Sequence, residues 1–232
     1  MPRTARIVVP TLPHHVTQRG NRRQPIFFED GDYALYRDLL AERCERSGVA
    51  CWAYCLMPNH VHLVLVPTTE DGLASVLGET HRRYTTFINA RARWTGHLFQ
   101  GRFGSAVMDE EHLVAATRYL SLNPVRAGLA KQAADWRWSS VRAHLAGKDD
   151  RLVRVRPLLD RVDAFADLVS LETGEMVAHQ LVALRMSETS GRPLGNASFL
   201  EQLEAALGRS LRPGRRGRKP RCEANVPKIG ER

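Results

Sequence analysis

Residues 49–67, VACWAYCLMPNHVHLVLVP, decide the fold because they read as two apolar strands joined at Pro58 and Asn59. This hairpin places His60 and His62 at the start of its second strand. Positions two apart on a strand stand about 7 Å apart on the same face, so one metal ion could accept both rings. Taken alone, such a pair also suits a core strand with structural histidines.

The segments around the hairpin supply a further strand and helix on each side. Residues 14–19 suit a first strand, and a helix is expected from about residue 30 until Gly48 ends it. A second amphipathic helix is expected at residues 73–92, followed by a fourth strand within residues 98–108. The order βαββαβ predicts an α+β fold, the ferredoxin-like or RRM-like plait, with helices on one face of an antiparallel sheet.

A third helix is expected to begin after Asp109, a suitable N-cap, and to end at Pro124. It carries Tyr119 and, four residues later on the same face, Asn123. Where this helix crosses the hairpin, it brings a phenol and an amide to two imidazoles. Such a ligand set suits Mg²⁺ or Mn²⁺, although imidazole also binds zinc. Tyr119 could then attack a phosphodiester polarised by the metal, or it could be a core aromatic.

The net charge of +9 is unevenly distributed along the 232 residues. Residues 1–149 hold 19 basic and 14 acidic side chains, residues 150–208 hold 6 and 9, and residues 209–232 hold 9 and 2. Residues 1–23 and residues 80–103 each contain five arginines and no acid. These stretches favour binding to a phosphate backbone.

Three regions are expected from this distribution: a catalytic domain at 1–149, a helical extension at 150–208, and a basic disordered tail at 209–232. Residues 150 to about 190 look helical and acidic. Ser198 and Glu201 form a capping-box pattern for a last helix that Gly208 closes. Two helices around a Gly-containing turn weakly suggest a helix-turn-helix, although the segment is net acidic.

The four cysteines lack a CxxC spacing and are expected to be reduced core thiols. No apolar run reaches the roughly 18 residues that a membrane span requires, and the first residues lack a signal-peptide pattern. We therefore expect a cytoplasmic, nucleoid-associated protein with no membrane contact, as a monomer or homodimer.

Four segments, PHHVTQRGNRRQPIF, MPNHVHLVLVP, LFQGRF and YLSLNPVRAGL, occur in that order between about residues 5 and 145. They resemble the single-tyrosine HUH transposases, most closely the branch of REP-associated tyrosine transposases. The resemblance implies a ferredoxin-like fold, a divalent metal, and cleavage of single-stranded DNA at a hairpin. It further implies transesterification without a nucleotide cofactor, leaving a free 3′-OH.

Carried over by motif, the resemblance makes His60 and His62 metal ligands and Tyr119 the nucleophile that becomes linked to a 5′-phosphate. Asn123 becomes the third ligand, where many insertion-sequence relatives have Gln. Basic side chains near these motifs and in the tail are candidates for holding DNA: Arg22, Arg23, Arg82, Arg83, Arg102, Arg215, Arg216, Arg218 and Lys219.

Two other interpretations remain open at the level of sequence. A plait-fold module could bind structured single strands without catalysis, which explains the charge but leaves the histidine pair and Asn123 without a role. A metal-dependent hydrolase that uses water would cleave DNA without becoming attached to it.

Overall fold

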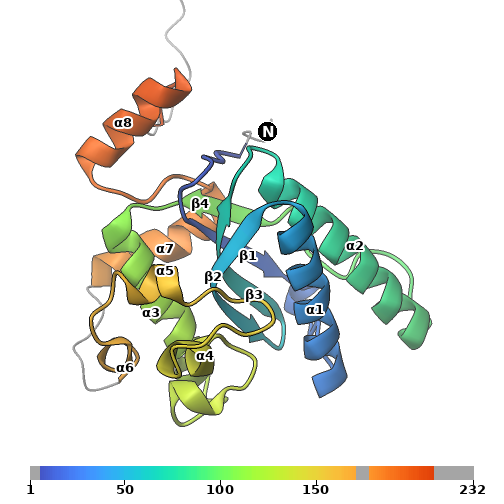
Figure 1. Cartoon of the computed structure of the whole chain (residues 1–232). Helices are drawn as coiled ribbons and strands as arrows, with labels where there is room; N and C mark the ends of the chain where they lie inside the picture. Colours follow the sequence, from blue (N-terminus) through green and yellow to red (C-terminus); the bar gives the residue numbers. More distant parts are fainter. Residues whose placement is uncertain (1–5, 171–177, 212–232) are drawn as a thin grey trace, which may run out of the picture.

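The computed structural model describes residues 6–170 and 178–211, and its centre is a four-stranded sheet in the order β2-β3-β1-β4. Each neighbouring pair of strands is antiparallel. This order and the two helices that follow β1 and β3 confirm the predicted α+β ferredoxin-like plait (Figure 1). The strands are β1 (His14–Arg19), β2 (Val49–Met57), β3 (His60–Pro67) and β4 (Gly104–Val107).

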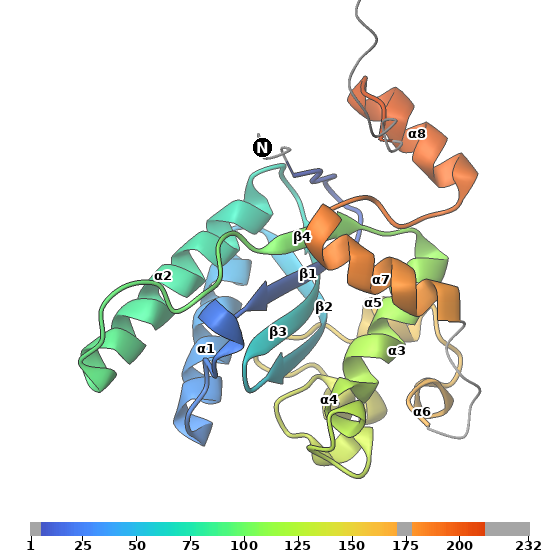
Figure 2. The same ribbon diagram turned by 180° about the vertical axis from the view of Figure 1, so that it is seen from behind.

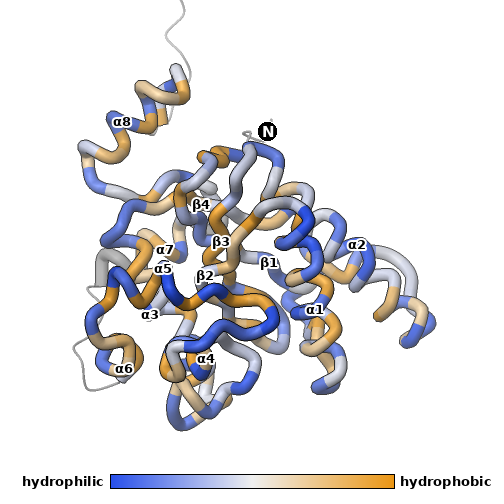
Figure 3. Tube along the Cα trace, viewed as in Figure 1, coloured by the Kyte–Doolittle hydropathy of each residue, from blue (hydrophilic) through white to orange (hydrophobic). Residues whose placement is uncertain are grey.

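Helices α1 (Asp30–Arg46) and α2 (Gly72–Ala92) pack together on one face of this sheet (Figure 1). The α1 helix begins in a capping box between Glu29 and Asp32. Side chains from both helices meet alternate residues of the central strands, so this face is a core of aliphatic and aromatic groups. Figure 3 shows apolar residues along β2 and β3, where both faces of the sheet are covered.

The opposite face is covered by α3 (Glu110–Arg126) and α7 (Ala178–Ser190), as the reverse view shows (Figure 2). The α3 helix begins at Asp109, whose side chain accepts the backbone N–H of His112, as predicted. It does not end at Pro124 as predicted, because the chain stays helical to Arg126. The last turn closes without the missing proline N–H, since Ala127 N–H donates to Asn123 C=O.

Strand register fixes which side chains reach this second face. In the hairpin, Met57 lies opposite His60 and Cys55 opposite His62; in the β1–β3 pair, Thr17 lies opposite His62. A shift by one residue would move every side chain of a strand to the other face. The α1–α2 core and the α3 face therefore depend on one another.

Most of the remaining elements lie beside α3, and the last described helix stands apart from the sheet (Figure 2). Residues 150–190 were expected to be helical, but the described part holds two four-residue helices before α7. The elements whose bounds have not yet been given are η1 (Asn21–Arg23), η2 (Ala133–Asp135), α4 (Val141–Leu145), α5 (Arg156–Leu159), α6 (Phe165–Leu168) and α8 (Ala197–Leu207).

The last helix, α8, is capped by Asn196, whose side chain accepts the N–H of Phe199, and not by Ser198 as predicted. Asn196 takes this position because its own N–H donates to Asp109, the cap of α3. Gly208 ends α8 with a φ of 61°, as expected. The division into a domain, an extension and a tail stays a prediction; most of the tail lies outside the described residues.

Cys44, Cys51 and Cys55 are buried free thiols, which confirms the prediction for these three, and burial raises the pKa of Cys44 to about 12. Cys222 lies outside the described residues. Within the part that the structure describes, no helix is long and apolar enough to cross a bilayer.

Candidate active site

His60 and His62 project from β3 onto the face that α3 covers, as the sequence predicts. Their ring centroids are 4.9 Å apart and the ring planes are nearly perpendicular. His62 is buried, with 1% of its surface exposed, whereas His60 is half-buried near the strand start. The β3 strand thus holds one imidazole inside the protein and one at the edge.

Asn59 fixes the proton on the ring of His60. The Asn59 Nδ2 amide donates to the backbone carbonyl of Arg23 at 3.0 Å, which directs its Oδ1 toward His60 Nδ1 at 2.6 Å. An amide oxygen only accepts, so Nδ1 of His60 carries the proton. The lone pair of His60 is consequently on Nε2, the nitrogen left for a ligand.

His15 is a member of this site that the sequence reasoning missed. It lies on β1 opposite Val64, and its Nε2 is 3.1 Å from Nδ1 of His62, with the two rings nearly parallel. The other nitrogen of His62, Nε2, is buried and has no hydrogen-bond partner. When Nδ1 of His62 donates to His15, this Nε2 keeps its lone pair, as a metal-binding imidazole must.

The three histidines are uncharged at neutral pH. Burial, together with the nearby Arg19, lowers the pKa of His60 to about 4, and burial lowers the pKa of His15 to about 4. The pKa of His62 lies well below its usual value because of burial, with smaller contributions from the other two rings and from Arg19. Neutral imidazole is the form that binds metals, so no proton has to be displaced at pH 7.

Tyr119 lies against this cluster from α3. Its ring stands edge-on to His62 and His15, with centroid separations of 5.4 and 6.4 Å, and 7% of its surface is exposed. The guanidinium of Arg126 is 5.5 Å from the centre of the same ring. The predicted meeting of phenol and imidazoles is therefore present in the fold.

Asn123 follows Tyr119 by one turn of α3, and its side-chain Nδ2 is buried without a hydrogen-bond partner. Among residues 6–170 and 178–211, no three His, Cys, Asp or Glu side chains are placed to hold a metal. Among the described residues, a cation bound by His60 and His62 would thus not find a third His, Cys, Asp or Glu side chain placed to bind it. The unpartnered buried Nε2 of His62 is an atom that suits such a cation, whereas the Nδ2 of Asn123 is a donor, so Asn123 could serve only through its amide oxygen.

Arginines that the sequence reasoning missed surround the site. The charge of Arg19 lowers the pKa values of both β3 histidines. Burial lowers the pKa of Arg126, and the like charges of Arg118 and Arg185 lower it further, whereas Tyr119 raises it. Arg118 and Arg126 could have been noticed from their spacing around the tyrosine. Arg185 could not, because α7 is distant in sequence.

The predicted DNA-binding residues fall into three groups. Arg22 and Arg23 are exposed in the turn after β1, and Arg102 is exposed in the loop before β4. Arg82 donates to Glu79 and Arg83 to Glu42 on the α1–α2 layer, across the sheet from Tyr119. The four tail candidates lie outside the described residues: Arg215, Arg216, Arg218 and Lys219.

Comparisons with known proteins match the region that carries this site. The family model described as Transposase IS200 like matches residues 8–123. A Haemophilus influenzae protein assigned as a REP-associated tyrosine transposase is 24% identical over 116 residues, covering 45% of this chain and 66% of its own length.

A solved structure of a REP-associated tyrosine transposase bound to a REP hairpin is similar in fold. The TM-score is 0.55 at 19% sequence identity, and the match covers 76% of this chain and 99% of that one. It shows a shared fold beyond the sheet and its two helices.

Proposed function

Because the chain belongs to the IS200-like transposase family, we propose that it cuts and rejoins single-stranded DNA at hairpin sites with Tyr119 as the nucleophile. The observation that carries this proposal is the edge-on contact of the Tyr119 ring with His62, at 5.4 Å between centroids. Residues far apart in the sequence are brought together there, in a pattern that a hydrophobic core does not require.

His60 and His62 would hold a divalent cation, Mg²⁺ or Mn²⁺, through their Nε2 atoms, and Asn123 would supply an amide oxygen. When bound, such a cation polarises the non-bridging oxygens of a phosphodiester and stabilises the charge of an in-line displacement. His15 and Asn59 position the two imidazoles through the hydrogen bonds at their Nδ1 atoms.

In the proposed reaction the phenol oxygen of Tyr119 attacks the phosphorus atom, forming a phosphotyrosine bond and breaking the bond to the 3′ oxygen. The phenol loses its proton and the leaving oxygen gains one, which gives a free 3′-OH. The positive charge of Arg126, whose guanidinium lies 5.5 Å from the centre of the Tyr119 ring, would attract the phosphate. Since the new bond is a phosphodiester, a later 3′-OH can reverse the step.

The partner would be a DNA strand that folds into a hairpin, as in the solved relative bound to a REP hairpin. The basic residues 209–232 would add a sequence-independent tether to the phosphate backbone. Such a protein would work in the cytoplasm at the nucleoid, as a monomer or a homodimer.

The test is covalent capture. The protein is incubated with Mn²⁺ and an end-labelled single strand containing a hairpin, and a denaturant-resistant adduct is expected. Tyr119→Phe should remove the adduct, and so should replacement of both His60 and His62 by Ala. Tyr33→Phe is the matched control, since Tyr33 is a buried tyrosine on α1 across the sheet.

Each other outcome identifies a different function. An unchanged adduct in Tyr119→Phe would contradict the assignment of the nucleophile. Cleavage that leaves no attached protein would indicate a hydrolase using water. Tight, metal-independent binding without cleavage would indicate a non-catalytic binding module.

A further inference from the structure

A cavity of about 590 Å³ opens beside the β1–η1 turn, between that turn and the C-terminal end of α2. Its lining includes Asn21, Arg22 and Phe28 from one side, and Asn89, Trp94 and His97 from the other. Amides, one arginine and aromatic rings line it, and no carboxylate does. A cavity of this size and lining suits a small ligand with an aromatic group and a negative charge.

Two aromatic rings form an exposed wall of this cavity. Trp94 is 52% exposed and Phe28 is 46% exposed, and their rings meet edge-to-face at 5.6 Å. Aromatic rings that stay exposed beside arginines are the usual platform for unpaired nucleic-acid bases, because every base has a face that can stack. A folded core would instead have buried these rings.

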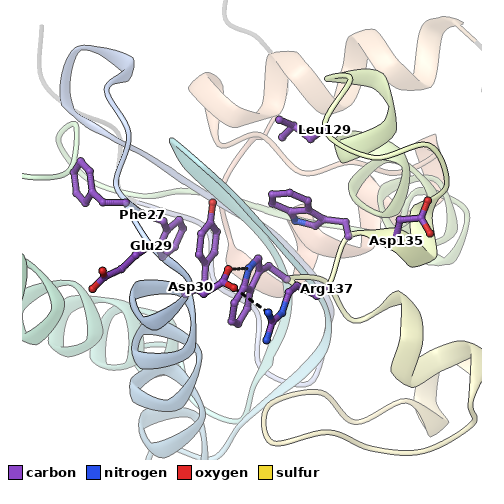
Figure 4. A pocket seen from close by; sticks show the side chains of 10 residues that line it. Phe27, Glu29, Asp30, Leu129, Asp135 and Arg137 are labelled. Atoms are coloured by element: carbon purple, nitrogen blue, oxygen red, sulfur yellow. Dashed lines mark hydrogen bonds and ion pairs between the residues drawn. The ribbon is translucent and has the colours of Figure 1, made fainter.

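A second cavity, of about 420 Å³, is also lined by Phe28 but differs in charge (Figure 4). It is lined by Glu29, Asp30 and Asp135, and its Arg137 donates to Asp30 at 2.9 Å. Carboxylates there would repel a phosphodiester. The lack of carboxylates therefore favours the first cavity, called the Trp94 cavity below, as the place for a nucleotide.

Buried contacts hold the walls of the Trp94 cavity in place. The fully buried carboxylate of Asp32 accepts the backbone N–H of Phe28 at 2.8 Å and two N–H groups of Arg91, on α2, at 2.6 and 2.8 Å. Across the cavity, a Cβ on Gly20 would come within 2.2 Å of the Gln24 carbonyl oxygen, so this turn requires glycine.

The same turn is connected to the candidate active site. Arg19 pairs with His60 across β1 and β3, and Asn59 joins the Arg23 carbonyl to the His60 ring. Asn59 thus links the turn that carries Arg22 to the imidazole of His60 by two hydrogen bonds.

We propose that this cavity binds one unpaired base of the DNA strand that enters the active site, with the base stacked on Trp94 and its phosphate beside Arg22. The proposal rests on the proposed function for the identity of the strand. It assigns the cavity a separate role, recognition of a single-stranded segment next to the cleaved bond.

The test uses an eight-nucleotide deoxythymidylate strand with a central 2-aminopurine, whose fluorescence falls when the base stacks. Titration with the full chain should quench it. Trp94→Ala should remove the quenching and weaken binding about 5- to 150-fold, the range for one stacked base. Trp94→Phe should restore most of the quenching. Phe87→Ala is the control, because Phe87 is 43% exposed on α2 and does not line the cavity.

Quenching in Trp94→Ala that equals that of the unaltered protein would overturn this proposal. So would equal quenching by a blunt duplex carrying the same base, since the cavity is assigned to an unpaired strand. Covalent capture by Tyr119 is scored on the same preparation. Normal capture with unaltered quenching in Trp94→Ala rejects the cavity and keeps the proposed function; absent capture with Trp94-dependent quenching rejects the catalysis and keeps the cavity.

Discussion

His14 and His15 are neighbours on β1 that face opposite sides of the sheet and serve different purposes. His14 lies on the α1–α2 side, where its Nε2 accepts the N–H of Val9 and its Nδ1 donates to the carbonyl of Leu12. His15 lies on the α3 side, where it bonds to His62, a ring with one nitrogen left unpartnered. Both histidines are buried. Burial alone therefore does not distinguish a core residue from a site residue, whereas the fate of each nitrogen does.

The largest expected effect separates two adjacent residues of β3. Leu63→Ala empties space in the α1–α2 core and should lower the free energy of unfolding by about 2–5 kcal/mol. His62→Leu should lower it by less, about 1–3 kcal/mol, because it leaves Nε2 of His15 without a partner but also removes the unsatisfied Nε2 of His62. Urea denaturation and covalent capture are measured for both. The contrast would fail if His62→Leu unfolded the protein or still formed the adduct.

A second prediction tests the partner of His62 directly. His15→Leu should weaken Mn²⁺ binding about 10- to 100-fold, because the His62 ring loses the acceptor that orients it. His15→Gln, which keeps an acceptor oxygen, should recover part of that affinity, and His14→Leu should leave it unchanged. Calorimetric titration gives the affinity, and nitrogen NMR of the imidazoles reports which His62 nitrogen carries the proton. A proton on Nε2 in the unaltered, metal-free protein would contradict the assignment.

The third prediction concerns pH and the structural histidine, His14. Burial lowers its folded-state pKa to about 4, below the value of about 6.5 in the unfolded chain. The unfolded state therefore binds the proton first, so the contribution of His14 is complete above pH 6.5 and is lost as pH falls toward 4. The loss amounts to about 1.4 kcal/mol per pH unit. Denaturation midpoints at pH 7.5 and 5.0 should differ less in His14→Gln, and an equal difference would refute this.

The smallest expected effect compares two exposed arginines, Arg22 in the turn after β1 and Arg82 on α2. Arg22→Gln should make the affinity for single-stranded DNA less salt-dependent by about 0.7 in the log–log slope, the value for one lost phosphate contact. Arg82→Gln should leave that slope unchanged, because Arg82 donates to Glu79. Binding measured at several salt concentrations distinguishes them. Equal slopes in the two variants would contradict the prediction that Arg22, and not Arg82, contacts a phosphate.

The strands, the first two helices and the start of α3 were predictable because local patterns specify them. The apolar runs around Pro58, the N-cap at Asp109 and the glycine after α8 each act within a few residues. The cap of α8 was misassigned because Ser198 also fits the local pattern. A contact with Asp109, distant in sequence, makes Asn196 the cap instead.

The candidate site was predictable to the extent that its residues stand in short motifs. His60 and His62 share a strand, and Tyr119 and Asn123 share a helix. His15 was not predictable, because its contact depends on the register between β1 and β3, 47 residues apart. The sequence likewise left open whether Arg82 is a free charge or is paired, and only the placement of the side chains shows that it pairs with Glu79.

The Asp32–Arg91 pair gives the molecule a property that ionic strength would reveal. Near 1 M salt the screening length falls to about 3 Å, so exposed arginines lose most of their attraction for DNA, while a carboxylate buried at 0% exposure keeps its partner. The cavity wall that this pair supports would therefore keep its shape at high salt concentration. The affinity for DNA that remains at this salt concentration would measure base stacking without electrostatic attraction. Charge would then govern how the strand is attracted, and stacking would govern how it is held.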